Sequence, residues 1–205
     1  HLAKIEPSLK PTQPVRRGTV IGLMGRTSAG VSPITKDRSH LHFEVGLMLS
    51  KGFNRWYAAQ PENKQSPNLH GLYNGQNLIG MDPMLILGQP KVDILAALRS
   101  QPTALTVGLR TNKMPDFVQR YAALTRGDAS RAAGWYVEFS WQGMPLRWTA
   151  LEAGNPRLPA QGWQIAEVDI TQRPLLIRRK LLADDGRKPG ELLTQKVGIL
   201  LSTAR

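Results

Sequence analysis

The sequence contains no cysteine among its 205 residues. A disulfide framework, an iron–sulfur cluster and a thiolate zinc site are therefore excluded, and any metal must be held by His, Asp or Glu. Long apolar runs are also missing. No stretch approaches the roughly 18–20 residues needed to cross a bilayer, so we expect no membrane span. The hydrophobic content of 41% is nevertheless enough for a packed core.

Acidic residues are scarce relative to basic ones. The 27 Lys and Arg residues outnumber the 15 Asp and Glu residues, which gives a formal net charge of +12 at pH 7. Such a chain favours anionic partners, for example nucleic acid, an acidic membrane surface or an acidic cell-wall polymer. The sequence has no helix-turn-helix, zinc-finger or RNA-binding aromatic signature, so we do not expect a nucleic-acid partner.

Composition and pattern divide the chain at about residue 90. Residues 1–90 contain a turn and short strand at 15–25, a loop at 26–38 and a long insertion at about 47–78 that is rich in Asn, Gln, Pro and Gly. Loops of this length within a compact domain are commonly functional or disordered. The Trp56-Tyr57 pair in this insertion either lines a glycan or peptide groove or anchors the segment.

Residues 91–205 predict a small α+β domain of unknown role. We expect helices at 93–99 and 115–126, a hairpin from 135–141 into 146–149, and further strands at 164–170, 175–182 and 196–201. This part contains no histidine and no acidic residues at metal-binding spacing, so the sequence assigns it no chemistry. A binding role, on a glycan or a partner protein, stays open.

Alternation with a period of two marks residues 39–45, Ser-His-Leu-His-Phe-Glu-Val. The pattern predicts a strand with apolar residues on one face and His40, His42 and Glu44 on the other. The two histidine Cα atoms would lie about 7 Å apart, so one imidazole can bind a metal while the other reaches a ligand on that metal. The alternative is a half-exposed polar face without chemistry.

Four segments, in this order, resemble the lysostaphin-type (LytM-like) zinc endopeptidases, which cut peptide cross-bridges in bacterial peptidoglycan. His1-Leu2 is similar to the end of the family's Tyr-x-His-Leu strand, and residues 15–25 are similar to its V-x-x-G-x-x-I-G-x-x-G segment. Residues 39–45 resemble its His-x-His-Phe-Glu signature, and Asp82-Pro83 resembles its closing V-D-P turn. The resemblance covers roughly residues 1–46 and 76–88.

The resemblance implies a mainly β fold, with an antiparallel β-sheet groove of the lysostaphin/LytM-like type that is incomplete at its N-terminus. It also implies a periplasmic or secreted hydrolase that uses one zinc ion to cut peptidoglycan cross-bridges by attack of a zinc-activated water. In this resemblance His42 takes the position of a zinc ligand. His40 and His1 take the positions of catalytic histidines, which orient or deprotonate the water and stabilise the tetrahedral intermediate.

One element of the family pattern is missing from this sequence. The family's other two zinc ligands are the His and Asp of an upstream His-x-x-x-Asp motif, and Asp37, His70 and Asp82 lack the spacing to replace them. Catalytic zinc has about three protein ligands, so we expect an upstream segment or a partner chain to complete the site. The alternative is a catalytically inactive relative that serves as a scaffold or as an activator of another cell-wall hydrolase.

Overall fold

The computed structural model describes residues 1–28 and 33–203, and the chain divides into two compact units, His1–Glu44 and Val45–Arg205. We call them the N-terminal and the C-terminal unit. The boundary between the units lies well before the predicted one at residue 90. Residues after Glu44 belong to the C-terminal unit because they share its hydrophobic core. Leu47, Phe53 and Ile79 are buried in the same cluster as Val107 and Leu193.

The N-terminal unit is built on a pair of antiparallel strands, β1 (Leu2–Ile5) and β2 (Gly22–Met24). The strand predicted within 15–25 is therefore present in its last part. Gly25 follows β2, and its N–H donates to the His1 carbonyl oxygen at 2.7 Å. A Cβ at this position would lie 2.4 Å from the Ala3 nitrogen, so only glycine lets the two segments approach this closely.

The predicted loop at 26–38 includes four residues, 29–32, that lie outside the described part of the chain. Its two described flanks come together, because the Ile34 N–H donates to the Arg26 carbonyl oxygen at 3.0 Å. A short 3-10 helix, Lys36–Arg38, ends this segment. The contact between the flanks turns the chain back toward its beginning.

The strand predicted at residues 39–45 is wrong for all but its last residue. β3 (Val45–Met48) begins only at Val45, and no described strand pairs with residues 39–44. Leu41 and Phe43 are 58% and 59% exposed, so the expected core face does not form. An extended segment without a partner strand has no ladder of hydrogen bonds to make it a strand.

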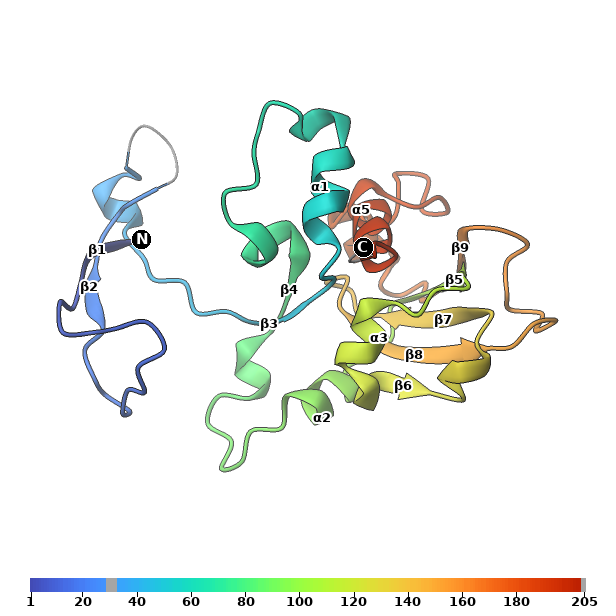
Figure 1. Ribbon diagram of the computed structural model, residues 1–205, viewed down its shortest axis with the longest axis horizontal. Coiled ribbons are helices and arrows are strands. Elements are labelled where there is room, and N and C mark those ends of the chain that lie inside the picture. The colour runs from blue at the N-terminus through green and yellow to red at the C-terminus, as the bar shows by residue number, and fades with distance from the viewer. Residues whose placement is uncertain (29–32, 204–205) are drawn as a thin grey trace. The chain divides into compact units, whose positions relative to one another are not determined.

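Two sheets organise the C-terminal unit (Figure 1). β3 pairs with β4 (Leu78–Met81), with Val45 opposite Met81. The main sheet has five strands in the order β6-β8-β7-β5-β9. Its strands are β5 (Leu105–Arg110), β6 (Thr125–Arg126), β7 (Gly134–Phe139), β8 (Pro145–Leu151) and β9 (Trp163–Val168). The predicted hairpin is confirmed as β7–β8, and the strand predicted at 164–170 is confirmed as β9.

Five α-helices of the C-terminal unit are described: α1 (Phe53–Ala59), α2 (Ile94–Arg99), α3 (Asp116–Arg120), α4 (Arg173–Arg178) and α5 (Glu191–Leu200). Its 3-10 helices are Pro61–Asn63, Gly71–Tyr73, Gly75–Asn77, Pro83–Leu85, Ala122–Leu124 and Ala129–Arg131. α2 confirms the helix predicted at 93–99, and Asp93 caps it by accepting from the Ala96 N–H at 2.9 Å. The helix predicted at 115–126 is shorter, because Tyr121 leaves the helical region at φ −121° and ψ 53°.

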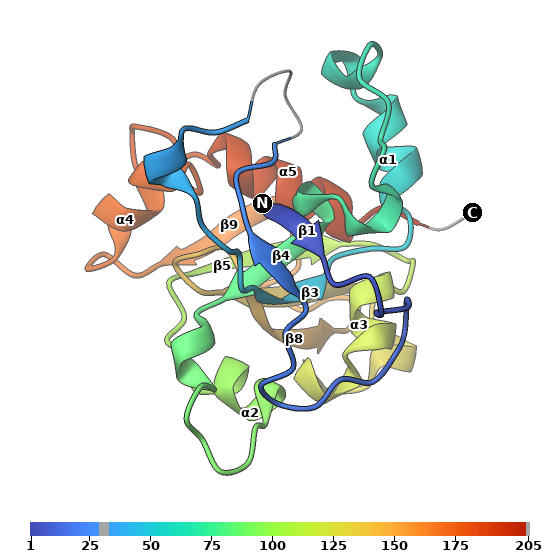
Figure 2. The same cartoon turned by 90° about the vertical axis from the view of Figure 1, so that its left-hand side faces the viewer.

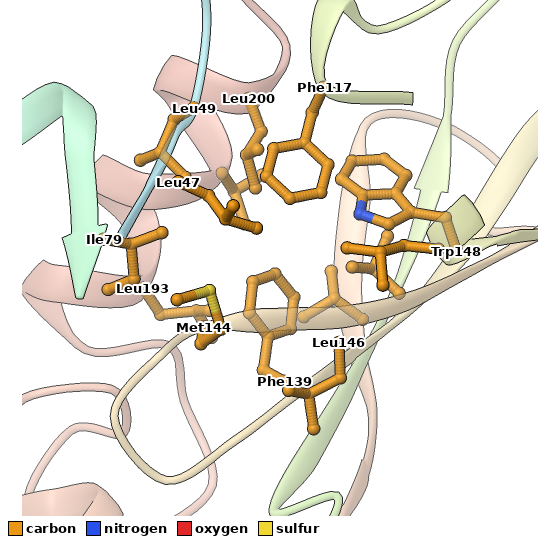
Figure 3. Packing of buried hydrophobic residues seen from close by; sticks show 14 of the residues in the cluster. Leu47, Leu49, Ile79, Phe117, Phe139, Met144, Leu146, Trp148, Leu193 and Leu200 are labelled. Carbon is orange, nitrogen blue, oxygen red and sulfur yellow. The ribbon is translucent and has the colours of Figure 1, made fainter. Parts of the chain in front are cut away.

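The strands predicted at 175–182 and 196–201 are wrong, since helices α4 and α5 occupy these regions. Leu193 and Leu200 of α5 point into the same interior as Phe139 and Leu146 of the main sheet (Figure 3). The predicted insertion also differs from expectation. It carries α1, which lies beside α5 in both views (Figures 1 and 2) and contributes the fully buried Phe53.

The chain is therefore of mixed α and β structure, with 28% of the described residues helical and 22% in strands, rather than mainly β. Several antiparallel pairings are present, as the resemblance implies. The C-terminal part combines helices with a sheet, as expected, and this sheet is antiparallel except for the parallel β6–β8 pair. None of the described helices is long and apolar enough to cross a bilayer.

Candidate metal centre

The three histidines predicted as site residues lie together in the N-terminal unit. The His1 ring centroid is 4.5 Å from that of His40 and 5.0 Å from that of His42. The His40 and His42 centroids are 4.9 Å apart. Pairing of β1 with β2 fixes His1, and the return of the chain at Ile34 brings residues 40 and 42 back to it.

The Nδ1 atom of each ring faces an oxygen atom. His1 Nδ1 contacts the Thr27 carbonyl oxygen, and His40 Nδ1 lies 2.6 Å from the Arg38 carbonyl oxygen. His42 Nδ1 lies 3.1 Å from Oε1 of Glu44. Carbonyl and carboxylate oxygens only accept hydrogen bonds, so these contacts favour the neutral tautomer in which Nδ1 is the donor and Nε2 has the free lone pair.

Ring nitrogens of the three histidines converge. His40 Nε2 and His42 Nε2 are 3.0 Å apart, and the three histidines each offer a ring nitrogen within 4.8 Å of the other two. Two lone pairs at this distance repel each other unless a proton or a metal ion lies between them. The arrangement is therefore suited to a cation.

The donor set fits zinc. Two nitrogen ligands held about 2.0–2.1 Å from a tetrahedral zinc ion lie about 3.4 Å from each other, close to the spacing of the His40 and His42 nitrogens. Neutral imidazole is a preferred zinc ligand, so each of these three rings has a suitable donor atom. A catalytic zinc ion has about three protein ligands and one open position.

The cluster is open at the surface of its unit. His1 is half-buried, whereas His40 and His42 are exposed. The side chains of His42 and Glu44 are 55% and 72% exposed, so their contact is screened by water and contributes little free energy of folding. Its role is to orient the His42 ring and select its tautomer.

The remaining candidate residues are not members of the metal-competent group found among the described residues. Asp37 lies in the 3-10 helix Lys36–Arg38 and is not part of the metal-competent group. His70 and Asp82 belong to the C-terminal unit. Asp82 confirms the predicted turn, because its Oδ1 accepts from the Met84 N–H at 2.9 Å.

Sequence reasoning missed the carbonyl oxygens of Thr27 and Arg38. They select the tautomers of His1 and His40. Every residue has a backbone carbonyl, so the sequence does not identify which carbonyl contacts a histidine. The sequence did not decide whether the Glu44 carboxylate contacts His42 or is solvated. The structure shows the contact with His42.

Comparison of the chain with family models, with curated proteins and with solved structures finds no match in any of the three. The functional argument therefore depends on the histidine cluster and on the sequence motifs around it.

Proposed function

We propose that this chain carries part of the catalytic centre of a zinc-dependent peptidoglycan endopeptidase of the lysostaphin/LytM-like type, acting in the periplasm or outside the cell. The observation that carries the proposal is the convergence of His1, His40 and His42, each with its Nδ1 held by an oxygen acceptor. The order of the family-like motifs along the sequence supports it independently of the geometry.

The residues divide into roles as follows. When bound, zinc supplies Lewis-acid chemistry and lowers the pKa of water to about 7. His42, oriented by Glu44, is the ligand for the metal. His40 and His1 each offer a ring nitrogen to the same small volume, where an imidazole can take a proton from water and then donate a hydrogen bond to the developing oxyanion.

An additional β segment is part of this proposal. The N-terminal unit pairs only two strands in its described residues, and it leaves Ile5, Leu23, Met24 and Phe43 about 60% exposed. Two-stranded sheets are marginally stable alone, and apolar patches of this kind mark interaction surfaces. A segment or partner chain that adds strands here would complete the groove and bring the remaining His and Asp ligands.

The test combines zinc content with activity. Native protein should contain near-stoichiometric zinc by elemental analysis and should cleave peptidoglycan cross-links in a chelator-sensitive manner. His42→Ala should lose both zinc and cleavage, and His40→Ala should lose cleavage. His70→Ala, in the other unit, is the matched control and should retain both.

Cleavage that survives in both the His42 and the His40 variant would rule out the proposal. Native protein that lacks zinc and does not cleave peptidoglycan would instead favour a scaffold or an activator of another cell-wall hydrolase.

A further inference from the structure

A groove of about 540 Å³ lies in the C-terminal unit, lined by residues of α1, β9 and α5 and of the segments next to α1 and α5. Its volume falls within the range of about 300–1,000 Å³ that sites for small organic ligands occupy. None of its lining residues belongs to the N-terminal unit, so its binding properties can be measured independently of the histidine cluster.

Two indole rings line this groove, those of Trp56 and Trp163. Both residues are only partly buried, although both also pack against the core. The buried Phe53 supports Trp56, because the two rings stack with centroids 5.8 Å apart. Gly198 of α5 makes room for it, since a Cβ there would lie 2.9 Å from the indole Nε1. The Trp56 ring is therefore positioned before any ligand arrives.

Amide and carboxylate groups accompany the indoles. Gln60 lines the groove, and it donates from Nε2 to the Trp56 carbonyl oxygen at 2.8 Å, so its Oε1 remains an acceptor. Glu62, Glu191 and Gln195 also line the groove. Together they offer both donors and acceptors beside flat apolar surfaces.

The charge of the lining decides between ligand classes. Within the described part of the chain, the groove wall contains two glutamates and neither Lys nor Arg, although the whole sequence carries a net charge of +12. Anionic polymers are therefore disfavoured at this surface. A cationic ligand gains little, because Glu191 already pairs with Lys180 at 3.1 Å and both side chains are more than 70% exposed.

We propose that this groove binds a neutral oligosaccharide. A pyranose ring has apolar C–H faces, which pack on indole rings. It also has hydroxyl groups at its edge, and neighbouring hydroxyl groups form hydrogen bonds with amide and carboxylate side chains. Trp56 and Trp163 supply the first kind of contact. Gln60, Glu62 and Gln195 supply the second. The site is distinct from the histidine cluster and needs no metal.

The experiment measures binding of tetra-N-acetylglucosamine and of cellotetraose to the full chain in the presence of EDTA, by calorimetry and by tryptophan fluorescence. At least one saccharide should bind with a fluorescence change. Trp163→Ala should weaken that binding about tenfold, the equivalent of about 1.4 kcal/mol. Trp141→Ala is the matched control and should bind like the parent, because Trp141 packs under Arg179 outside the groove lining.

A second variant tests the groove without removing any group that would contact the ligand. Gly198→Ala should push the Trp56 ring toward the groove and weaken binding, while the thermal unfolding profile shows that the chain remains folded. Absence of binding of both saccharides at millimolar concentration would overturn the proposal. So would equal losses in the Trp163 and Trp141 variants, or binding of tetralysine in place of either saccharide.

Discussion

His42 depends on Glu44 for its orientation and its tautomer, because the Glu44 carboxylate is the acceptor that faces His42 Nδ1. Partners of this kind commonly change metal affinity by about 10–100-fold when they are removed. Since Glu44 is exposed, we expect Glu44→Gln to weaken zinc binding by about tenfold, at the low end of that range. Competition with a chromogenic chelator measures this.

The control for this prediction is Glu6→Gln in the same unit, because the Glu6 carboxylate accepts from the nearby Ser8 and is not part of the histidine cluster. Equal zinc affinity in the Glu44 variant and the parent would show that Glu44 does not support His42.

Lys196 is a second residue whose surroundings predict a measurable effect. It is 5% exposed, and its Nζ donates to the carbonyl oxygens of Gln76 at 2.9 Å and Leu78 at 3.3 Å. Burial lowers the pKa of Lys196 from 10.5 to about 8. Between these two pH values the unfolded chain binds more protons than the folded one, so the free energy of unfolding should rise with pH.

Denaturant titrations between pH 8 and pH 10.5 test the Lys196 prediction. Relative to Lys196→Met, the parent should gain about 3 kcal/mol in free energy of unfolding across this interval. Lys180→Met changes an exposed lysine and should show no such difference from the parent. A constant offset between the Lys196 variant and the parent at all pH values would contradict the prediction.

Among the secondary-structure elements, the β1–β2 pair is the one that positions the metal centre. Its closest approach is at Gly25, where a Cβ would lie 2.4 Å from the Ala3 nitrogen. We expect Gly25→Ala to separate the two segments, displace His1 and lower the rate of cross-link cleavage, while zinc content is retained because His42 is unchanged. Gly75→Ala, where a Cβ meets nothing within 4 Å, should leave cleavage unaltered. Unchanged cleavage in the Gly25 variant would mean that the position of His1 does not matter for the reaction.

The elements also show what the sequence alone could predict. The β7–β8 hairpin was predictable because alternating apolar residues flank Gln142-Gly143, and Gly143 adopts the positive φ of 86° that a turn favours. The secondary structure of the segments at 175–182 and 196–201 was not predictable, because a short apolar run has the same pattern in a buried strand and in a buried helix. The segment predicted as a strand began at residue 196 and so left out Leu193, whose i, i+4, i+7 spacing with Val197 and Leu200 marks the buried face of helix α5.

The metal site was predictable to a similar extent. The i, i+2 spacing of His40 and His42 marked them in the sequence, and they do lie together with His1. The prediction that a strand holds them was wrong, because residues 39–44 have no described partner strand and are held instead by contacts within the segment, such as His40 to Arg38. Contacts with backbone atoms depend on how the chain turns, which residue types alone do not specify.

For the molecule as a whole, the net charge of +12 predicts a salt-dependent attraction to anionic cell-wall material. Screening shortens the reach of surface charges from about 10 Å at 0.1 M salt to about 3 Å at 1 M. Binding to insoluble peptidoglycan should therefore weaken steeply over this range in a sedimentation assay. Binding of the neutral tetrasaccharides should change little over the same range, and a parallel loss of both would contradict this division.

The return of the chain at Ile34 has a consequence for folding. Because the histidines come from residue 1 and from residues 40 and 42, assembly of the cluster closes a loop that spans almost the whole N-terminal unit. Closing that loop costs chain entropy, which metal coordination offsets only when the unit is folded. Metal binding and folding of this unit are then thermodynamically linked, so a change in one changes the other. Removing the ion should speed amide hydrogen exchange in β1 and β2 while exchange in β5 and β7 stays slow.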